Sequence, residues 1–130
     1  MRFLICLLPI GCVEAPTYEQ ASTADYGSSI TQQDAEVQAK ALMEGRLKDP
    51  YSAMWQCSDP QKGFLGDGKA WGSVSYYGWV LICSINSKNS YGAYIGGQEY
   101  HFLFINGQLR RVALMSSERG FATQQIIYNQ

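Results

Sequence analysis

The sequence has few of the residues that most enzymes use for catalysis. It contains a single histidine, His101, and charged residues make up only 16% of the chain, with a formal net charge of −1. This balance provides no basic surface for nucleic acid or for an anionic membrane. With 46% hydrophobic residues in 130, the chain has enough apolar content for one domain with one core.

Common catalytic and cofactor motifs are also missing. There is no CxxC pair, and one histidine with two widely spaced cysteines does not supply the four ligands of a zinc site. The stretch GAYIGG lacks the lysine of a phosphate-binding loop, and Ser84 and Lys88 are four apart rather than three as in SxxK. His101 falls within a predicted strand, where a lone histidine is more typical of a sheet face than of a general base. We therefore expect no enzyme activity, no catalytic residues, no metal and no cofactor.

No apolar run reaches the ~20 residues of a transmembrane helix. The longest run, at the start, follows Arg2 and ends at Gly11 and Cys12, which is typical of a secretory signal. Because it ends in Gly-Cys, it resembles the bacterial lipoprotein signal, whose cysteine carries lipid after cleavage. The resemblance implies a signal peptide over residues 1–11, palmitate-type lipid on Cys12, and an outer-membrane lipoprotein facing the periplasm or the cell surface. A plain signal peptide cut elsewhere and a buried N-terminal strand are the alternatives.

Residues 12–32 are polar and have no apolar periodicity, so we expect the lipidated cysteine to be followed by a flexible tether. The single folded domain then spans residues 33–130. It opens with a helix capped by Thr31, whose apolar stripe includes Ala35, Ala39 and Leu42, with Val37, Ala41 and Met43 alongside. Asp49-Pro50 ends this helix, because the residue before a proline avoids helical dihedrals.

Strand patterns dominate the remainder of the chain. Alternating or apolar runs predict strands over residues 51–57, 73–79, 79–87, 100–105 and 108–114. Asn106-Gly107 predicts a type I′ hairpin turn, and the glycines between residues 59 and 72 predict a loop. Residues 116–130 fit either a helix or an edge strand. We therefore predict an α+β fold with one N-terminal helix packed on a small antiparallel sheet of four to five strands.

The cysteines also fit a protein exported to the cell envelope. Cys6 would leave with the signal and Cys12 would carry lipid, so Cys57 and Cys83 remain, both in predicted strands on faces that look buried. In an oxidising envelope we expect these two to form a disulfide, although two buried thiols or a reactive thiol are alternatives. The enclosed loop of about 26 residues predicts roughly 3–4 kcal/mol of stabilisation.

A long polar loop between two strands is the best candidate for binding. Its candidate residues are Lys88, Asn89, Ser90, Tyr91 and Tyr94. Tyrosines give large contact areas at low entropic cost, and small polar residues give adaptable hydrogen bonds. The alternative is that Asn and Gly only shape the turn while the tyrosines fold back on the sheet.

The segments LKDPYSAMW (residues 47–55) and ICSINSKNSYGAYIG (residues 82–96) carry a resemblance to a known pattern. Together they resemble a domain of small bacterial secreted proteins and lipoproteins with the pattern LKDPxSA, then a cysteine before VNAKNSYGGYxG. Ser87 and Ala93 depart from it. The resemblance implies an α+β domain in which the loop is a shared structural or binding element.

We therefore expect a non-enzymatic protein-binding lipoprotein of the cell envelope, an accessory component of an envelope or secretion assembly. Its partner would be another envelope protein, its membrane contact would be the lipid anchor, and it would not bind nucleic acid. An exclusion, immunity or inhibitor lipoprotein and a cell-wall hydrolase are the alternative functions.

Overall fold

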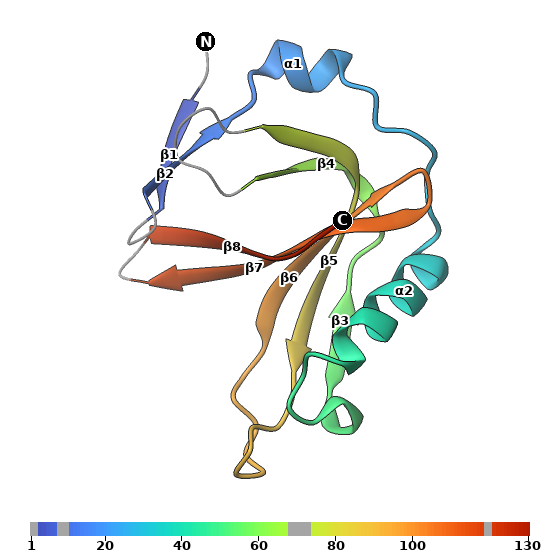
Figure 1. The fold of residues 1–130 in the computed structure, drawn as a ribbon, viewed down its shortest axis with the longest axis vertical. Helices are drawn as coiled ribbons and strands as arrows, with labels where there is room; N and C mark the ends of the chain where they lie inside the picture. Colours follow the sequence, from blue (N-terminus) through green and yellow to red (C-terminus); the bar gives the residue numbers. More distant parts are fainter. Residues whose placement is uncertain (1–2, 8–10, 68–73, 119–120) are drawn as a thin grey trace.

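The computed structural model describes residues 3–7, 11–67, 74–118 and 121–130. Strands dominate these residues, and two short helices precede most of them (Figure 1). The elements in chain order are β1 Phe3–Leu7, β2 Gly11–Ala15, α1 Tyr18–Thr23, α2 Gln32–Glu44, the 3-10 turn η1 Pro50–Ser52, β3 Met54–Cys57, β4 Gln61–Gly66, β5 Ser75–Asn86, β6 Gln98–Ile105, β7 Gln108–Glu118 and β8 Phe121–Asn129.

One curved antiparallel sheet of six strands forms the centre of the fold. Its order is β3-β5-β6-β7-β8, and β4 also pairs with β5. The long strand β5 makes this possible, because β3 pairs with its C-terminal part and β4 with its N-terminal part. Helices ahead of an antiparallel sheet confirm the α+β prediction. The sheet has six strands where four to five were expected, and two helices, α1 and α2, precede it where one was expected. In addition, β1 and β2 pair as a separate hairpin.

The strand that sequence patterns missed is β4. Its glycines suggested a loop, but Gly63 lies directly opposite Gly78 in the β4–β5 ladder. A Cβ on Gly78 would lie 2.3 Å from the carbonyl oxygen of Phe104, and one on Gly63 would lie 2.8 Å from a methyl carbon of Val80. The glycines therefore mark close approach inside a sheet. The predicted strands over residues 73–79 and 79–87 merge into one strand, β5 Ser75–Asn86, and residue 73 lies outside the described residues.

Helix α2 begins where the sequence predicts. The hydroxyl oxygen of Thr31 accepts a hydrogen bond from the backbone N–H of Asp34 at 3.1 Å, which satisfies one of the free donors at the helix start. The helix buries Ala35, Ala39 and Met43 against the sheet. Val37, which was expected beside the buried stripe, is 63% exposed.

The core lies between α2 and one face of the sheet. Leu81 and Cys83 of β5 and Phe102 and Phe104 of β6 are fully buried there. Residues that alternate with these, such as Val80 and Leu103, form a smaller cluster on the other face. The predicted alternation along both strands is confirmed, and it follows from the two-residue period of a strand.

Two further predictions concern the C-terminal half. Asn106 and Gly107 both have positive φ, 51° and 78°, and connect the paired residues Ile105 and Gln108, as the hairpin turn requires. In the described part of residues 116–130, the helical alternative is wrong, since β8 Phe121–Asn129 pairs with β7 there.

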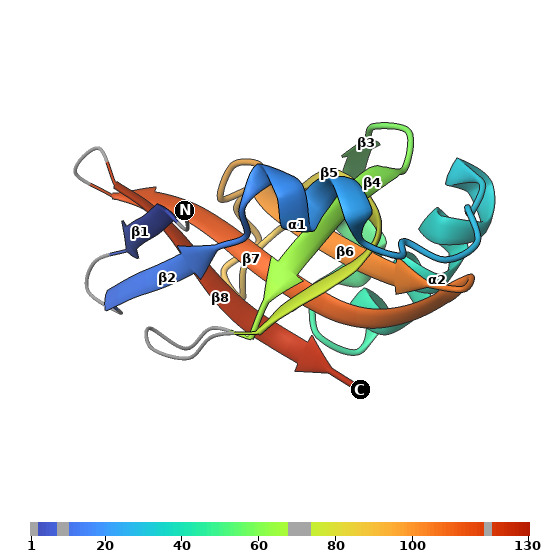
Figure 2. The same ribbon diagram turned by 90° about the horizontal axis from the view of Figure 1, so that it is seen from above.

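The segment predicted as a tether contains structure of its own. Helix α1 has a capping box in which Thr17 and Gln20 bond reciprocally. After α1, the Tyr26 ring meets Tyr77 edge-on at 5.7 Å, and the backbone N–H of Ser28 donates to Asn106 at 3.0 Å. Helix α1 lies at the end of the molecule opposite the β5–β6 loop (Figure 1), and it faces the viewer when the molecule is seen from above (Figure 2). The domain boundaries remain a prediction.

The predicted leader and anchor fall at the β1–β2 hairpin. Residues 1–2 and 8–10 lie outside the described residues, and Cys12 is the second residue of β2. Cleavage before Cys12 and its lipidation therefore stay predictions. In the part of the chain that the structure describes, no helix has the length and apolar character to cross a membrane.

Candidate functional site

The loop between β5 and β6 projects beyond the sheet at one end of the molecule (Figure 1). Residues 90–97, between the two strands, are all exposed. Two glycines give the loop its path, Gly92 with φ 80° and Gly96 with φ 93°. Side chains other than glycine rarely adopt such angles, so the glycines are needed for the backbone path.

Asn89 holds the loop in shape. Its side-chain oxygen accepts hydrogen bonds from the backbone N–H groups of Tyr91 at 2.9 Å and Ala93 at 3.2 Å. Its own N–H donates to the Ala93 carbonyl at 2.8 Å, and its carbonyl accepts from Gly92 at 3.0 Å. Asparagine suits this role because its side chain imitates a backbone turn. The predicted binding residue Asn89 thus supports its neighbours from within the loop.

The base of the loop is attached to η1. The backbone N–H of Lys88 donates to the Ser52 hydroxyl at 3.0 Å, and the Tyr94 hydroxyl donates to the Ser52 carbonyl at 3.2 Å. Lys88 and Tyr94 also form an isolated β-bridge, and the Lys88 ammonium lies 5.5 Å from the Tyr94 ring centroid. These contacts fix the direction in which the loop points.

The tip carries the most accessible aromatic side chain of the loop. Tyr91 is 95% exposed, whereas Tyr94 is 47% exposed and uses its hydroxyl to hold Ser52. Ser90 beside Tyr91 is exposed as well. The alternative in which the tyrosines fold back on the sheet therefore does not apply to Tyr91 and applies only in part to Tyr94.

Sequence reasoning did not single out Tyr51. This residue of η1 is 92% exposed and immediately precedes Ser52, to which the loop is bonded. Tyr51 belongs to the LKDPYSAMW segment. It lies near the loop because this segment is bonded to the loop through Tyr94 and Ser52, which are 42 residues apart in the sequence. Only the tertiary structure brings Tyr51 and the loop to the same end of the molecule.

The predicted disulfide joins Cys57 and Cys83. The two residues lie directly opposite each other on β3 and β5, with their Cα atoms 4.1 Å apart. Cys83 is completely buried in the core beside α2. Because both sulfurs are bonded, neither thiol is a nucleophile, and the bond instead holds β3 against β5.

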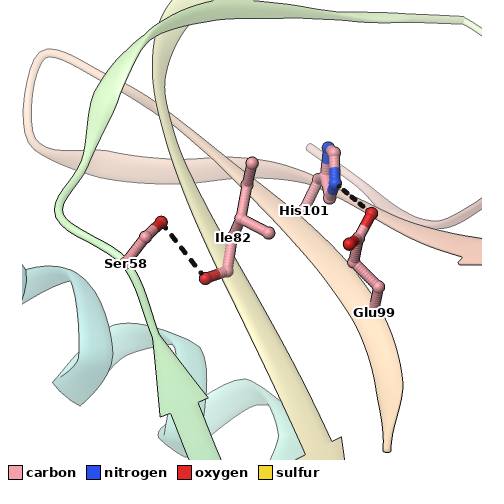
Figure 3. Close-up of polar contacts among 4 residues, drawn as sticks. All are labelled: Ser58, Ile82, Glu99 and His101. Carbon is pink, nitrogen blue, oxygen red and sulfur yellow. Dashed lines mark hydrogen bonds and ion pairs between the residues drawn. The ribbon is translucent and has the colours of Figure 1, made fainter.

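His101 pairs with a carboxylate on its own strand. Its Nε2 lies 2.9 Å from a carboxylate oxygen of Glu99 on the same strand, and the two side chains are 19% and 55% exposed (Figure 3). The nearby Ser58 directs its hydroxyl to the carbonyl of Ile82, at 3.5 Å, rather than to the histidine (Figure 3). Among the described residues, no three His, Cys, Asp or Glu side chains gather as a metal site would require.

Tyr100 lies in the buried core near the start of β6. Burial raises the pKa of its phenol, because a charged phenolate loses hydration in the core. Its hydroxyl donates to the Gln98 side chain at 3.3 Å, and its ring stacks on Phe102 at 6.3 Å. Tyr100 is therefore part of the packed base below the loop.

In comparison with known proteins, no family model, no curated protein and no solved structure matches this chain.

Proposed function

We propose that this chain is a cell-envelope lipoprotein that binds another envelope protein and catalyses no reaction. In this proposal it serves as an accessory component of an envelope or secretion assembly, anchored to the outer membrane by lipid on Cys12. The Cys57–Cys83 disulfide supports export, because structural disulfides persist in oxidising compartments.

The observation that carries the binding proposal is the exposed Tyr91 on a loop held by hydrogen bonds. An exposed aromatic ring on a rigid support buries a large area on binding and has little conformational freedom to lose. Asn89 and Ser52 supply that support through four contacts of 2.9–3.2 Å. Tyrosine is also among the residues that most often dominate the energetics of interfaces.

Site-specific photocrosslinking in cells tests this proposal. The photoreactive amino acid p-benzoylphenylalanine replaces Tyr91 in one strain and Gln125, an exposed residue of β8, in a control strain. We expect a discrete adduct with one envelope protein from position 91 and none from position 125. A folded protein that gives no adduct at position 91, or the same adducts at both positions, would contradict the proposal.

The anchor has its own test. We expect labelling with radioactive palmitate in cells that express the chain and none after Cys12→Ser. Ser22, which is exposed on α1, provides a control as Ser22→Ala, which should keep the label. Label that persists in Cys12→Ser would place the lipid on another residue, and a wild-type chain without label would contradict the lipoprotein proposal.

A further inference from the structure

The outer edge of β3 is the second feature of the molecule that suggests a partner. Among the described strands, β3 pairs with β5 alone, so its other edge has no strand neighbour. An unpaired strand edge presents backbone N–H and C=O groups that another extended chain can bond.

The ladder shows which groups face outward. The N–H of Ser58 donates to the carbonyl of Ile82 on β5 at 3.0 Å. Because bonded residues alternate along an antiparallel pair, Gln56 also faces β5, while Trp55 and Cys57 direct their backbone groups away. The Cys57 carbonyl accepts from the Gln32 side chain at 3.3 Å. Among the described residues, the N–H and C=O of Trp55 and the N–H of Cys57 have no hydrogen-bond partner.

A groove of about 530 Å³ runs between this edge and α2, which lies beside β3 in Figure 1. Apolar and aromatic side chains form much of its wall, namely Val37, Ala41, Leu47, Tyr51 and Trp55. Lys40 and Glu44 line it from α2, and the Lys40 ammonium lies 5.7 Å from the Trp55 ring centroid.

We propose that β3 accepts an extended peptide segment of the partner protein as an additional strand of the sheet. The peptide residue opposite Trp55 exchanges two hydrogen bonds with it, and its side chain points to the same face as the Trp55 ring. That face is the groove, so an apolar side chain fits there. This inference rests on the proposed function and specifies the part of the partner that is recognised.

The unpaired backbone groups select an extended chain over other occupants. Strand addition takes its affinity from main-chain hydrogen bonds and its specificity from pockets for alternate side chains, and this edge offers both. The groove also lies next to the base of the binding loop, because Tyr51 in its wall precedes Ser52, which binds Lys88 and Tyr94.

Amide hydrogen exchange on the full chain tests the register. The probe is a library of random seven-residue peptides, from which binders are selected and resynthesised. We expect a bound peptide to slow exchange of the Trp55 and Cys57 amides by at least about tenfold, since each gains a hydrogen bond. The Gln56 and Ser58 amides, already bonded to β5, should not change.

Variants test the groove. Ala41→Trp fills it, and we expect peptide affinity to fall by about tenfold or more, as for loss of a well-packed anchor. Val37→Arg, at an exposed wall position, is a second variant that does not depend on Ala41 tolerating a large side chain. Gln61→Trp, exposed on β4, is the matched control and should bind as the wild type does.

Three outcomes would overturn strand addition. Peptides that protect the loop amides 90–95 instead of Trp55 place binding at the loop alone and leave the proposed function intact. A dimer that protects Trp55 without any peptide makes a second copy the occupant. Failure to select any peptide removes the inference, while loss of the crosslink at position 91 removes the proposed function separately.

Discussion

At the scale of single residues, the candidate site separates side chains that shape the loop from side chains that it presents. The Asn89 side chain accepts hydrogen bonds from its own loop, and the Tyr94 hydroxyl donates one to Ser52. These polar groups are therefore already used within the protein. Tyr91 makes no such use of its side chain and is 95% exposed. Residue type predicted the group as a whole, but only the contacts divide it into these two roles.

The two tyrosines should differ in their effect on stability. Tyr91→Ala removes an exposed ring and should change the free energy of unfolding by less than about 0.5 kcal/mol. Tyr94→Phe loses the hydrogen bond to Ser52 and should cost about 0.5–1.5 kcal/mol. Urea unfolding measures both, and a larger loss for Tyr91→Ala would show that its ring belongs to the packed structure.

Asn89→Ala should loosen the loop without removing Tyr91. The Tyr91 and Ala93 amides lose their acceptor, so their hydrogen exchange should become faster. The free energy of unfolding should fall by about 0.5–1.5 kcal/mol. Asn89→Asp keeps an acceptor oxygen and serves as the control. Unchanged exchange in Asn89→Ala would mean that the glycines alone hold the loop.

Tyr100 should make the domain sensitive to alkaline pH. Its native pKa is raised by burial above the usual value of about 10, so the unfolded chain releases this proton first. Stability from the neutral phenol is complete below pH about 10 and is lost as pH rises through the native pKa.

The free energy of unfolding should therefore fall less steeply above pH about 10 in Tyr100→Phe than in the wild type. Urea titrations at several pH values measure this slope. Tyr91→Phe, which changes an exposed ring, is the control and should keep the wild-type slope. Equal slopes in Tyr100→Phe and the wild type would contradict the assignment.

At the scale of elements, small residues explain how closely helix α2 packs on the sheet and how β4 pairs with β5. Helix α2 reaches the sheet because Ala35 and Ala39 are small and fully buried. Strand β4 pairs with β5 through two facing glycines, Gly63 and Gly78. In each case small residues allow two backbones to come together. The sequence pattern predicted the helix, but it indicated a loop where the glycines of β4 lie.

Gly78→Ala should be strongly destabilising. The added Cβ meets the Phe104 carbonyl at 2.3 Å, a backbone atom that cannot move without shifting β6. Overpacking of this kind costs about 1–3 kcal/mol, which thermal or urea unfolding measures. Gly45→Ala is the control, because its nearest neighbour lies 3.9 Å away and its φ is −84°. Similar stability in both variants would contradict the packing argument.

At the scale of the whole molecule, the disulfide and the curved sheet place two candidate surfaces together. Cys57–Cys83 fixes β3 to β5, and β5 leads directly into the binding loop. The same bond therefore holds the free edge of β3 beside α2 and the loop at one end of the fold. Breaking the bond should affect both surfaces.

Reduction should lower the free energy of unfolding by about 3–4 kcal/mol, because the closed loop no longer restricts the unfolded chain. Urea midpoints with and without dithiothreitol measure the loss. The double variant Cys57→Ala with Cys83→Ala should have the urea midpoint of the reduced wild type, and dithiothreitol should not lower it further. A reduced chain as stable as the oxidised one would contradict a stabilising role.

The sequence by itself determined the helix and its cap, the alternating faces of the central strands, the Asn106-Gly107 turn and the cysteine pair. Each depends on local dihedrals, on periodicity or on the chemistry of two residues. The tertiary structure alone decided that β4 is a strand, that Tyr51 neighbours the loop, and that β3 keeps a free edge along α2. Those features depend on which distant backbones approach each other, and a one-dimensional pattern does not contain that information.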